Sequence, residues 1–149
     1  MAKRILVPLD QTLDSESVLP WVADAARGGE SAVRLILVFP VPDNVIGKDG
    51  HLVAYADQEI ARLEGEGMDY LRAIEAKLGG LAVECAVRFG EPVKEILKEA
   101  DTFRADLIAM TTRRRHQLSR LVLGSTAEQI CRRTELPVFV YRPGTRAEA

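Results

Sequence analysis

The sequence predicts an α/β fold, with a five-stranded parallel sheet and helices on both of its faces. Two observations carry this prediction: short apolar runs recur five times along the chain, and the segments between them repeat apolar residues at helical spacing. Strands of a parallel sheet are buried on both faces and therefore read as continuous apolar runs. Strands that alternate with helices are typical of right-handed crossover connections within one sheet.

The apolar runs place the strands at 5–9, 32–39, 81–87, 106–110 and 136–141. Between them, apolar residues at helical spacing predict helices over 18–26, 55–78, 93–100 and 127–134, of which the second is long, amphipathic and closed by Gly79-Gly80. The first helix tolerates Pro20 if Glu16 or Ser17 caps it, because first-turn amides have no intrahelical partner. The segment 40–54 holds two prolines and two glycines, and we expect a long loop there.

Length, composition and charge are those of one ordinary domain. The chain has 149 residues, 47% of them hydrophobic and 28% charged, with a net charge of -2. We expect a single domain over 1–143 and a flexible tail at 144–149. The charge is uneven, because residues 106–149 carry eight arginines against four acidic residues and the rest of the chain is acidic. The near-neutral total argues against a dedicated nucleic-acid binder.

The two cysteines and the apolar segments favour a cytoplasmic protein. Cys85 and Cys131 form no CxxC pair, and we expect both to be reduced, small core residues. The first apolar run is too short for the core of a signal peptide, and no apolar stretch approaches the roughly 20 residues that span a bilayer.

Candidate ligand-binding residues follow the strands, because open parallel sheets bind ligands outside the carboxyl ends of their strands. They are Pro8, Leu9 and Asp10 after the first strand, Pro40 and Val41 after the second, Met110, Thr111 and Thr112 after the fourth, and Gly124, Ser125 and Thr126 before the last helix. The last three residues suit a phosphate at a helix N-terminus. They equally suit a plain Ser or Thr cap, and Asp10 can likewise cap the helix that follows it.

The sequence predicts no catalytic residue and no metal ligand. It holds no phosphate loop, no GxGxxG, no GxSxG and no HExxH. His51 falls in the expected loop and His116 follows the arginine run at 113–115, so neither has the company of a metal site or of a general base. That arginine run is either a solvated loop or an anion clamp, since guanidinium groups bind phosphate bidentately.

The chain resembles the universal stress protein family over nearly its whole length. The motifs that carry the resemblance are ILVPLD at 5–10 followed by Ser15-Glu16, Gly90-Glu91-Pro92, ADLIAM at 105–110, LVLGST at 121–126 and PVFV at 137–140. The resemblance implies a fold related to the adenine nucleotide alpha hydrolases, with strand order 3-2-1-4-5. It also implies a homodimer formed through the last strand, and roles in stress tolerance and regulation rather than a fixed reaction.

Family members that bind ATP carry the signature G-x2-G-x9-G-[ST], and this chain departs from it. Counting back from Gly124-Ser125, the second glycine falls at Arg114 and the first at Thr111. Large side chains at those positions obstruct the nest of backbone N–H groups that curls round phosphates. The leading expectation is therefore a dimeric regulatory or partner-binding module without tight ATP binding.

The alternative is that arginines replace the lost backbone contacts, and that ATP or AMP, with Mg²⁺, still binds with at most slow hydrolysis. The site would then comprise Pro8, Leu9, Asp10, Val38, Met110, Thr111, Arg114, Gly124, Ser125 and Thr126. An arginine must lose rotamer entropy to do this, which favours the first reading. Contact with nucleic acid through the arginine patch is a third reading, which the acidic remainder of the chain argues against.

The last strand predicts how the dimer forms. Val138, Phe139, Val140 and Tyr141 would lie at the edge of the sheet, where an unpaired apolar strand risks aggregation. Pairing across a two-fold axis removes that risk. A protein partner other than a second copy of the chain is a further expectation.

Overall fold

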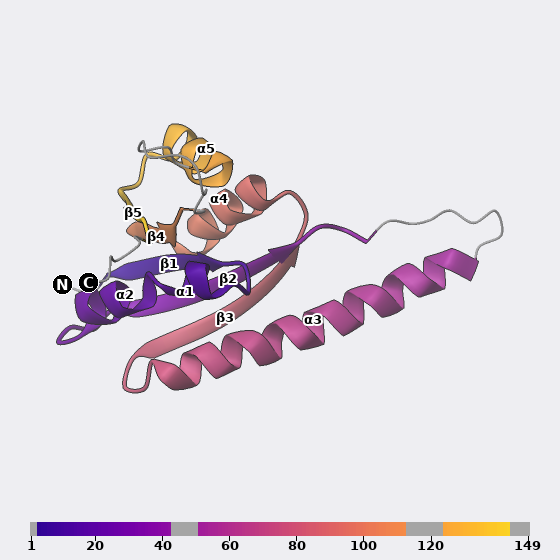
Figure 1. Ribbon diagram of the computed structural model, residues 1–149, viewed down its shortest axis with the longest axis horizontal. Helices are drawn as coiled ribbons and strands as arrows, with labels where there is room; N and C mark the ends of the chain where they lie inside the picture. The colour runs from indigo at the N-terminus through magenta and orange to yellow at the C-terminus, as the bar shows by residue number, and fades with distance from the viewer. Residues whose placement is uncertain (1–2, 43–50, 113–123, 144–149) are drawn as a thin grey trace.

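The computed structural model describes residues 3–42, 51–112 and 124–143, with the backbone alone described at 51–55. Its five strands form one parallel sheet in the order β3-β2-β1-β4-β5, which confirms the predicted fold class and strand order (Figure 1). The strands are β1 (Arg4–Leu9), β2 (Ala32–Phe39), β3 (Ala82–Phe89), β4 (Leu107–Thr111) and β5 (Val138–Tyr141). The helices are α1 (Leu13–Glu16), α2 (Leu19–Ala26), α3 (His51–Lys77), α4 (Pro92–Phe103) and α5 (Ser125–Arg133).

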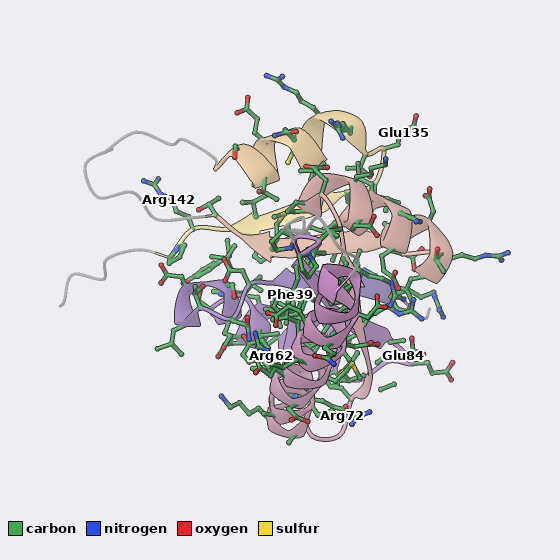
Figure 2. The ribbon with its side chains drawn as sticks, turned by 90° about the vertical axis from the view of Figure 1, so that its right-hand side faces the viewer. Phe39, Arg62, Arg72, Glu84, Glu135 and Arg142 are labelled. Carbon is green, nitrogen blue, oxygen red and sulfur yellow. The ribbon has the colours of Figure 1, made fainter. Side chains whose placement is uncertain are left out.

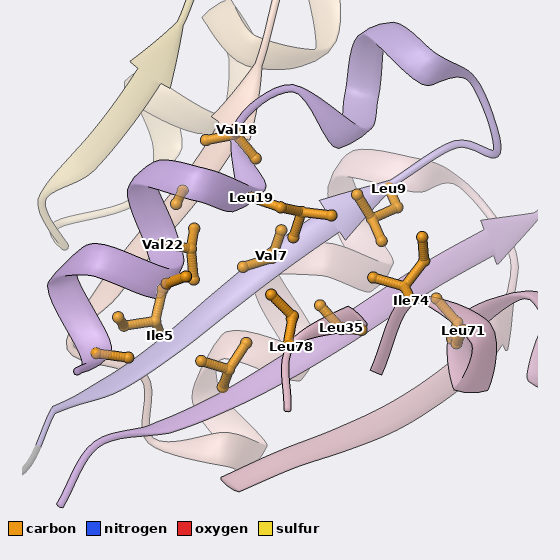
Figure 3. Packing of buried hydrophobic residues seen from close by; sticks show 14 of the residues in the cluster. Ile5, Val7, Leu9, Val18, Leu19, Val22, Leu35, Leu71, Ile74 and Leu78 are labelled. Carbon is orange, nitrogen blue, oxygen red and sulfur yellow. The ribbon is translucent and has the colours of Figure 1, made fainter. Parts of the chain in front are cut away.

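Side-chain alternation along the central strand β1 divides the core into two layers. Ile5 and Val7 pack with residues of α2 and α3 on one face of the sheet (Figure 3). Leu6 points to the other face and packs with residues of α4 and α5. All three side chains are fully buried, which explains why this strand reads as a continuous apolar run.

Helix α3 is longer than the sequence predicts and begins inside the expected loop. It starts at His51, so the expectation of a loop over the whole of 40–54 is wrong for residues 51–54, which contain no helix breaker, and residues 43–50 lie outside the described residues. Its C-terminal half packs on β2 and β3, and its other end extends beyond the sheet (Figure 1). Gly67 permits the close approach, because a Cβ there would lie 3.0 Å from both Phe39 and Val87. On the outward side, Arg62 bridges two glutamates of the same helix (Figure 2).

The first predicted helix is α2, and a short helix α1 that the sequence does not predict precedes it. The side chain of Thr12 caps α1 by accepting the Ser15 N–H at 3.1 Å, whereas neither Glu16 nor Ser17 caps α2, so that expectation is wrong. Helix α2 then begins with Val18 as its N-cap, without a side-chain cap, and Pro20 lies in its first turn as expected. A helix of four residues is too short for apolar periodicity to reveal.

A buried ion cluster holds α4 against the sheet. Glu99 is 3% exposed, and its carboxylate accepts hydrogen bonds from Arg34 of β2 and Arg88 of β3. The Arg34 guanidinium also lies over the ring of Phe103, 4.4 Å from its centroid. These contacts hold the C-terminal half of α4 against β2 and β3.

The two cysteines differ from expectation in one case. Cys85 is half-buried as expected, but Cys131 is exposed, so its assignment to the core is wrong. The stripe of α5 that faces the sheet runs through Ala127 and Ile130, and Cys131 lies beside that stripe on the solvent side. Within the described residues, none of the helices has both the length and the apolar character that a membrane span requires.

Candidate functional site

A crevice of about 290 Å³ opens at the carboxyl ends of β1 and β4. The chain leaves β1 toward β2 on one side and reaches β4 on the other, so the crevice lies at the point where the winding direction reverses. It is lined by Pro8, Leu9, Asp10, Ser15, Ile36, Val38, Pro92, Ile96, Met110, Thr111, Thr112, Gly124, Ser125, Thr126 and Ala127. The lining combines apolar side chains with hydroxyl groups and the Asp10 carboxyl group.

The predicted site residues converge on this crevice. All of those named for the adenine-nucleotide alternative line it except Arg114, which lies outside the described residues together with the rest of 113–123. The role of the arginine run therefore stays a prediction. Pro40 and Val41, which follow β2, do not line the crevice, and Val41 is 60% exposed.

The crevice is also lined by residues that the sequence did not predict as site residues. They are Ser15, Ile36, Pro92, Ile96 and Ala127. Ile36 stands two residues before Val38 in β2, so strand alternation puts both on one face and could have identified it. Pro92 and Ile96 enter because α4 packs beside β2, which no short-range pattern reveals.

The loop after β1 is closed by a ring of hydrogen bonds. The Asp10 carboxylate accepts from the backbone N–H of Thr12 at 3.0 Å and from its hydroxyl at 2.5 Å. Between them, Gln11 adopts a left-handed conformation with φ 70°, which a non-glycine residue adopts at a cost. Because Thr12 is the cap of α1, the alternative that Asp10 caps the following helix is wrong.

Ser15 joins the β1 end of the crevice to its β4 end. Its hydroxyl accepts the Asp10 N–H at 3.1 Å and donates to the Thr12 carbonyl at 2.9 Å. Its own carbonyl accepts the Thr111 hydroxyl at 3.3 Å. Ser15 is 8% exposed, so these bonds replace water contacts that the residue has lost.

Thr111 stands at the first glycine position of the nucleotide signature and is an ordinary strand residue. It is the last residue of β4 and pairs with Tyr141 of β5. Its hydroxyl is held by Ser15 on the α1 face of the sheet. The backbone here is extended, as in the rest of β4.

Thr112 is a buried polar residue that lines the crevice. Its N–H donates to the Tyr141 carbonyl at 3.0 Å, and the residue is only 4% exposed. Within the described part of the chain, its hydroxyl has no hydrogen-bond partner, although most buried hydroxyls have one. Met110, two residues earlier, packs with α4 and α5, so alternation puts Thr112 on that same face, where the crevice lies.

The N-terminus of α5 forms the opposite edge of the crevice. Gly124 is its N-cap and has no side chain that could accept from the first turn, so the alternative of a Ser or Thr cap is wrong. The first helical bond runs from the Glu128 N–H to the Gly124 carbonyl at 2.9 Å. The N–H groups of residues 125–127 therefore have no acceptor within the helix, and the positive end of the helix dipole faces the crevice.

Two titratable groups near α3 have raised pKa values. Burial, followed by the hydrogen bond to Glu16, raises the pKa of Tyr70. Burial, followed by the nearby Glu75 carboxylate, raises the pKa of Cys85 to about 11, so its thiol is protonated and unreactive at neutral pH. Within residues 3–42, 51–112 and 124–143, no three His, Cys, Asp or Glu side chains form a group that could hold a metal ion.

Comparison with known proteins identifies the family of this chain. The model of the universal stress protein family matches residues 1–142. The chain belongs to this family. Universal stress protein MJ0531 of Methanocaldococcus jannaschii is 28% identical over 144 residues, which cover 94% of this chain and 82% of the relative.

Solved structures share the fold. MJ0577, a protein whose biochemical function was assigned from its structure, superposes with a TM-score of 0.82 at 23% identity, over 96% of this chain and 97% of its own. UspA of Lactobacillus plantarum superposes with a TM-score of 0.73 at 16% identity, over 94% and 97%. A universal stress protein crystallised in complex with cAMP superposes with a TM-score of 0.60 at 17% identity, over 95% and 98%. At these identities the likeness concerns the fold alone.

Proposed function

We propose that this chain is a cytoplasmic, dimeric regulatory module of the universal stress type, whose crevice binds an adenine mononucleotide such as AMP and binds ATP only weakly. The observation that carries the proposal is the pairing of an apolar pocket with an anion-binding edge. Val38, Ile96 and Met110 offer apolar contact to a flat base. The N-terminus of α5 and the Thr112 hydroxyl offer hydrogen-bond donors to one phosphate group.

Weak binding of a triphosphate follows from what replaces the glycine signature. Thr111 continues the extended strand and carries a branched side chain where a glycine would let the backbone turn. The crevice volume of about 290 Å³ lies at the lower end of the range for small-molecule pockets. A ligand with one phosphate suits this space better than one with three. A relative of the same fold crystallised with cAMP, which carries a single phosphate, is consistent with the proposal.

Calorimetry with AMP, with ATP and Mg²⁺, and with inorganic phosphate tests the ligand. AMP is expected to bind more tightly than either of the others, and native mass spectrometry of the freshly purified protein is expected to show no ATP. The variant Thr112→Val removes the crevice hydroxyl with little change in shape, and it is expected to weaken AMP binding by about threefold to tenfold. Thr102→Val is the matched control, because Thr102 is exposed on α4 and its hydroxyl donates to Lys98. One ATP carried through purification per chain would refute weak ATP binding.

The dimer is proposed to form through β5 at the free edge of the sheet. Phe139 is 39% exposed there, and Trp21 of α2 is 51% exposed beside it, with ring centroids 6.4 Å apart. Tyr141 extends this aromatic patch, 5.9 Å from Trp21. A second copy paired along β5 would cover this exposed apolar surface and would also pair the backbone N–H and C=O groups of the edge strand.

Sedimentation of Phe139→Lys tests the interface. A buried positive charge on both copies is expected to give monomers, whereas Ala73→Lys on the exposed side of α3 should sediment like the wild type. The thermal midpoint of each variant shows that it is folded. Dimers of folded Phe139→Lys would place the interface elsewhere.

A further inference from the structure

Tyr70 links the long helix α3 to the short helix α1. Its hydroxyl donates to the Glu16 carboxylate at 2.6 Å, across 54 positions of sequence. Glu16 is the last residue of α1, and the residue before it, Ser15, holds both ends of the crevice through the hydrogen bonds described above. One turn of helix therefore carries both the partner of Tyr70 and the residue that joins β1 to β4.

Helix α1 has little apolar packing of its own. Its first residue, Leu13, is 82% exposed, and Ser15 is its one buried residue. In contrast, α3 is anchored on the sheet by Leu71 and Ile74, and by Leu78 directly after its last residue, all of which are buried (Figure 3). The position of α1 thus depends on polar contacts, and the contact with Tyr70 ties it to an element that is fixed independently.

The surroundings of the Tyr70 hydroxyl reach the crevice. Burial and the Glu16 carboxylate raise its pKa, the Ser15 hydroxyl acts in the opposite direction, and the Asp10 carboxylate raises it further. Glu16, the acceptor of this hydroxyl, directly follows Ser15 in α1. Tyr70 does not line the crevice itself, so any influence on a ligand passes through α1.

We propose that Tyr70 is a positioning residue for the crevice, which holds α1 so that Ser15 keeps Asp10 and Thr111 in place. Ligand affinity then depends on a hydroxyl of α3 that touches no ligand. Conversely, a ligand in the crevice stabilises the contact between α1 and α3, because linkage between two sites is reciprocal. The effect on affinity rests on the proposed binding of AMP, whereas the effect on α1 does not.

The test compares Tyr70→Phe with the wild type in two measurements. Without ligand, hydrogen exchange is expected to quicken at the amides of Asp10 and Ser15, while the amides around Leu71 and Ile74 keep their protection. With AMP, the affinity of Tyr70→Phe is expected to fall by about threefold to tenfold, the value of one hydrogen bond, with little change in thermal midpoint.

Three further variants separate positioning from general stability. Glu16→Ala removes the acceptor and is expected to behave like Tyr70→Phe, and Glu16→Gln keeps an acceptor oxygen and is expected to restore most of the affinity. Arg62→Gln removes exposed ion pairs that join residues of α3 only, and it should leave exchange at residues 10–16 unchanged.

Each of the two measurements can refute a different part of the proposal. Unchanged exchange at residues 10–16 in Tyr70→Phe would overturn the positioning role, whatever the ligand result. Equal AMP affinity of wild type and Tyr70→Phe would overturn the influence on binding. If the wild type did not bind AMP, the proposed function would fall, and the exchange data would still decide the role of Tyr70.

Discussion

The two sides of the crevice satisfy their polar groups in opposite ways. On the β1 side, Asp10, Thr12 and Ser15 bind one another through a closed set of hydrogen bonds. On the α5 side, the first-turn amides have no acceptor within the helix, and the Thr112 hydroxyl has no partner among the described residues. Both sides line the same crevice. We call the β1 side the closed side and the α5 side, with Thr112, the open side.

This difference suggests that one side gives the crevice its shape and that the other side binds the ligand. A polar group that is satisfied within the protein stabilises the fold and gives its loop one geometry. A buried donor left without a partner lowers the stability of the empty protein, and a ligand that pairs with it recovers that free energy on binding. We therefore expect the removal of a hydroxyl group to have opposite effects on stability on the two sides.

The largest expected effect belongs to the closed side. Ser15→Ala removes two side-chain hydrogen bonds and leaves the Asp10 N–H and the Thr12 carbonyl without that partner. We expect the free energy of unfolding to fall by about 2 kcal/mol, measured by urea denaturation. Ser17→Ala, which removes one exposed bond to Asp14, is the control. A loss no larger than that of the control would mean that the closed side does not stabilise the fold.

On the open side, Thr112→Val is expected to stabilise the ligand-free protein by about 1 kcal/mol, because it removes a buried hydroxyl that lacks a partner. The same denaturation experiment measures it. Thr111→Val provides the contrast, since that hydroxyl is bonded to Ser15 and its loss should destabilise. A destabilised Thr112→Val would show that its hydroxyl is already satisfied in the empty protein.

A smaller effect is expected at the strained position of the closed side. Gln11 has φ 70°, a region that glycine occupies without steric cost. Gln11→Gly should therefore raise the free energy of unfolding, by at most about 1 kcal/mol, since the greater freedom of glycine in the unfolded chain opposes the relief of strain. Gln11→Ala keeps the strain and serves as the comparison, and equal stabilities of the two variants would contradict the assignment of strain.

The smallest effect concerns the charge beside the open side. Glu128 lies in the first turn of α5, where a negative charge favours the helix and opposes an incoming anion. Glu128→Gln should lower stability by about 0.5 kcal/mol and slightly increase AMP affinity, as calorimetry at low salt would detect. Because Glu128 also pairs with Arg132 at 2.9 Å, Arg132→Gln controls for that ion pair.

The residues predict the long elements and much of the crevice, and they miss the short or distant contributions. Apolar runs identify the strands because strands buried on both faces carry apolar side chains throughout. Asp10 and Met110 could be named because the ends of parallel strands meet at one edge, and Gly124 because it precedes a helix. The sequence does not predict helix α1, because one turn of helix has no apolar periodicity. It also does not predict the start of α3 at His51, because the prolines and glycines of the preceding segment indicate a loop.

Fold class, strand order and the edge where a ligand would bind follow from the pattern of apolar runs together with the family motifs, since both depend on local sequence. The tertiary packing determined the contacts between residues that lie far apart in the chain. It joined Ser15 to Thr111 and Tyr70 to Glu16, and it buried the Thr112 hydroxyl beside the uncapped end of α5. Such contacts depend on register and helix placement, because a side chain is satisfied or left unpaired only by the neighbours that folding brings to it.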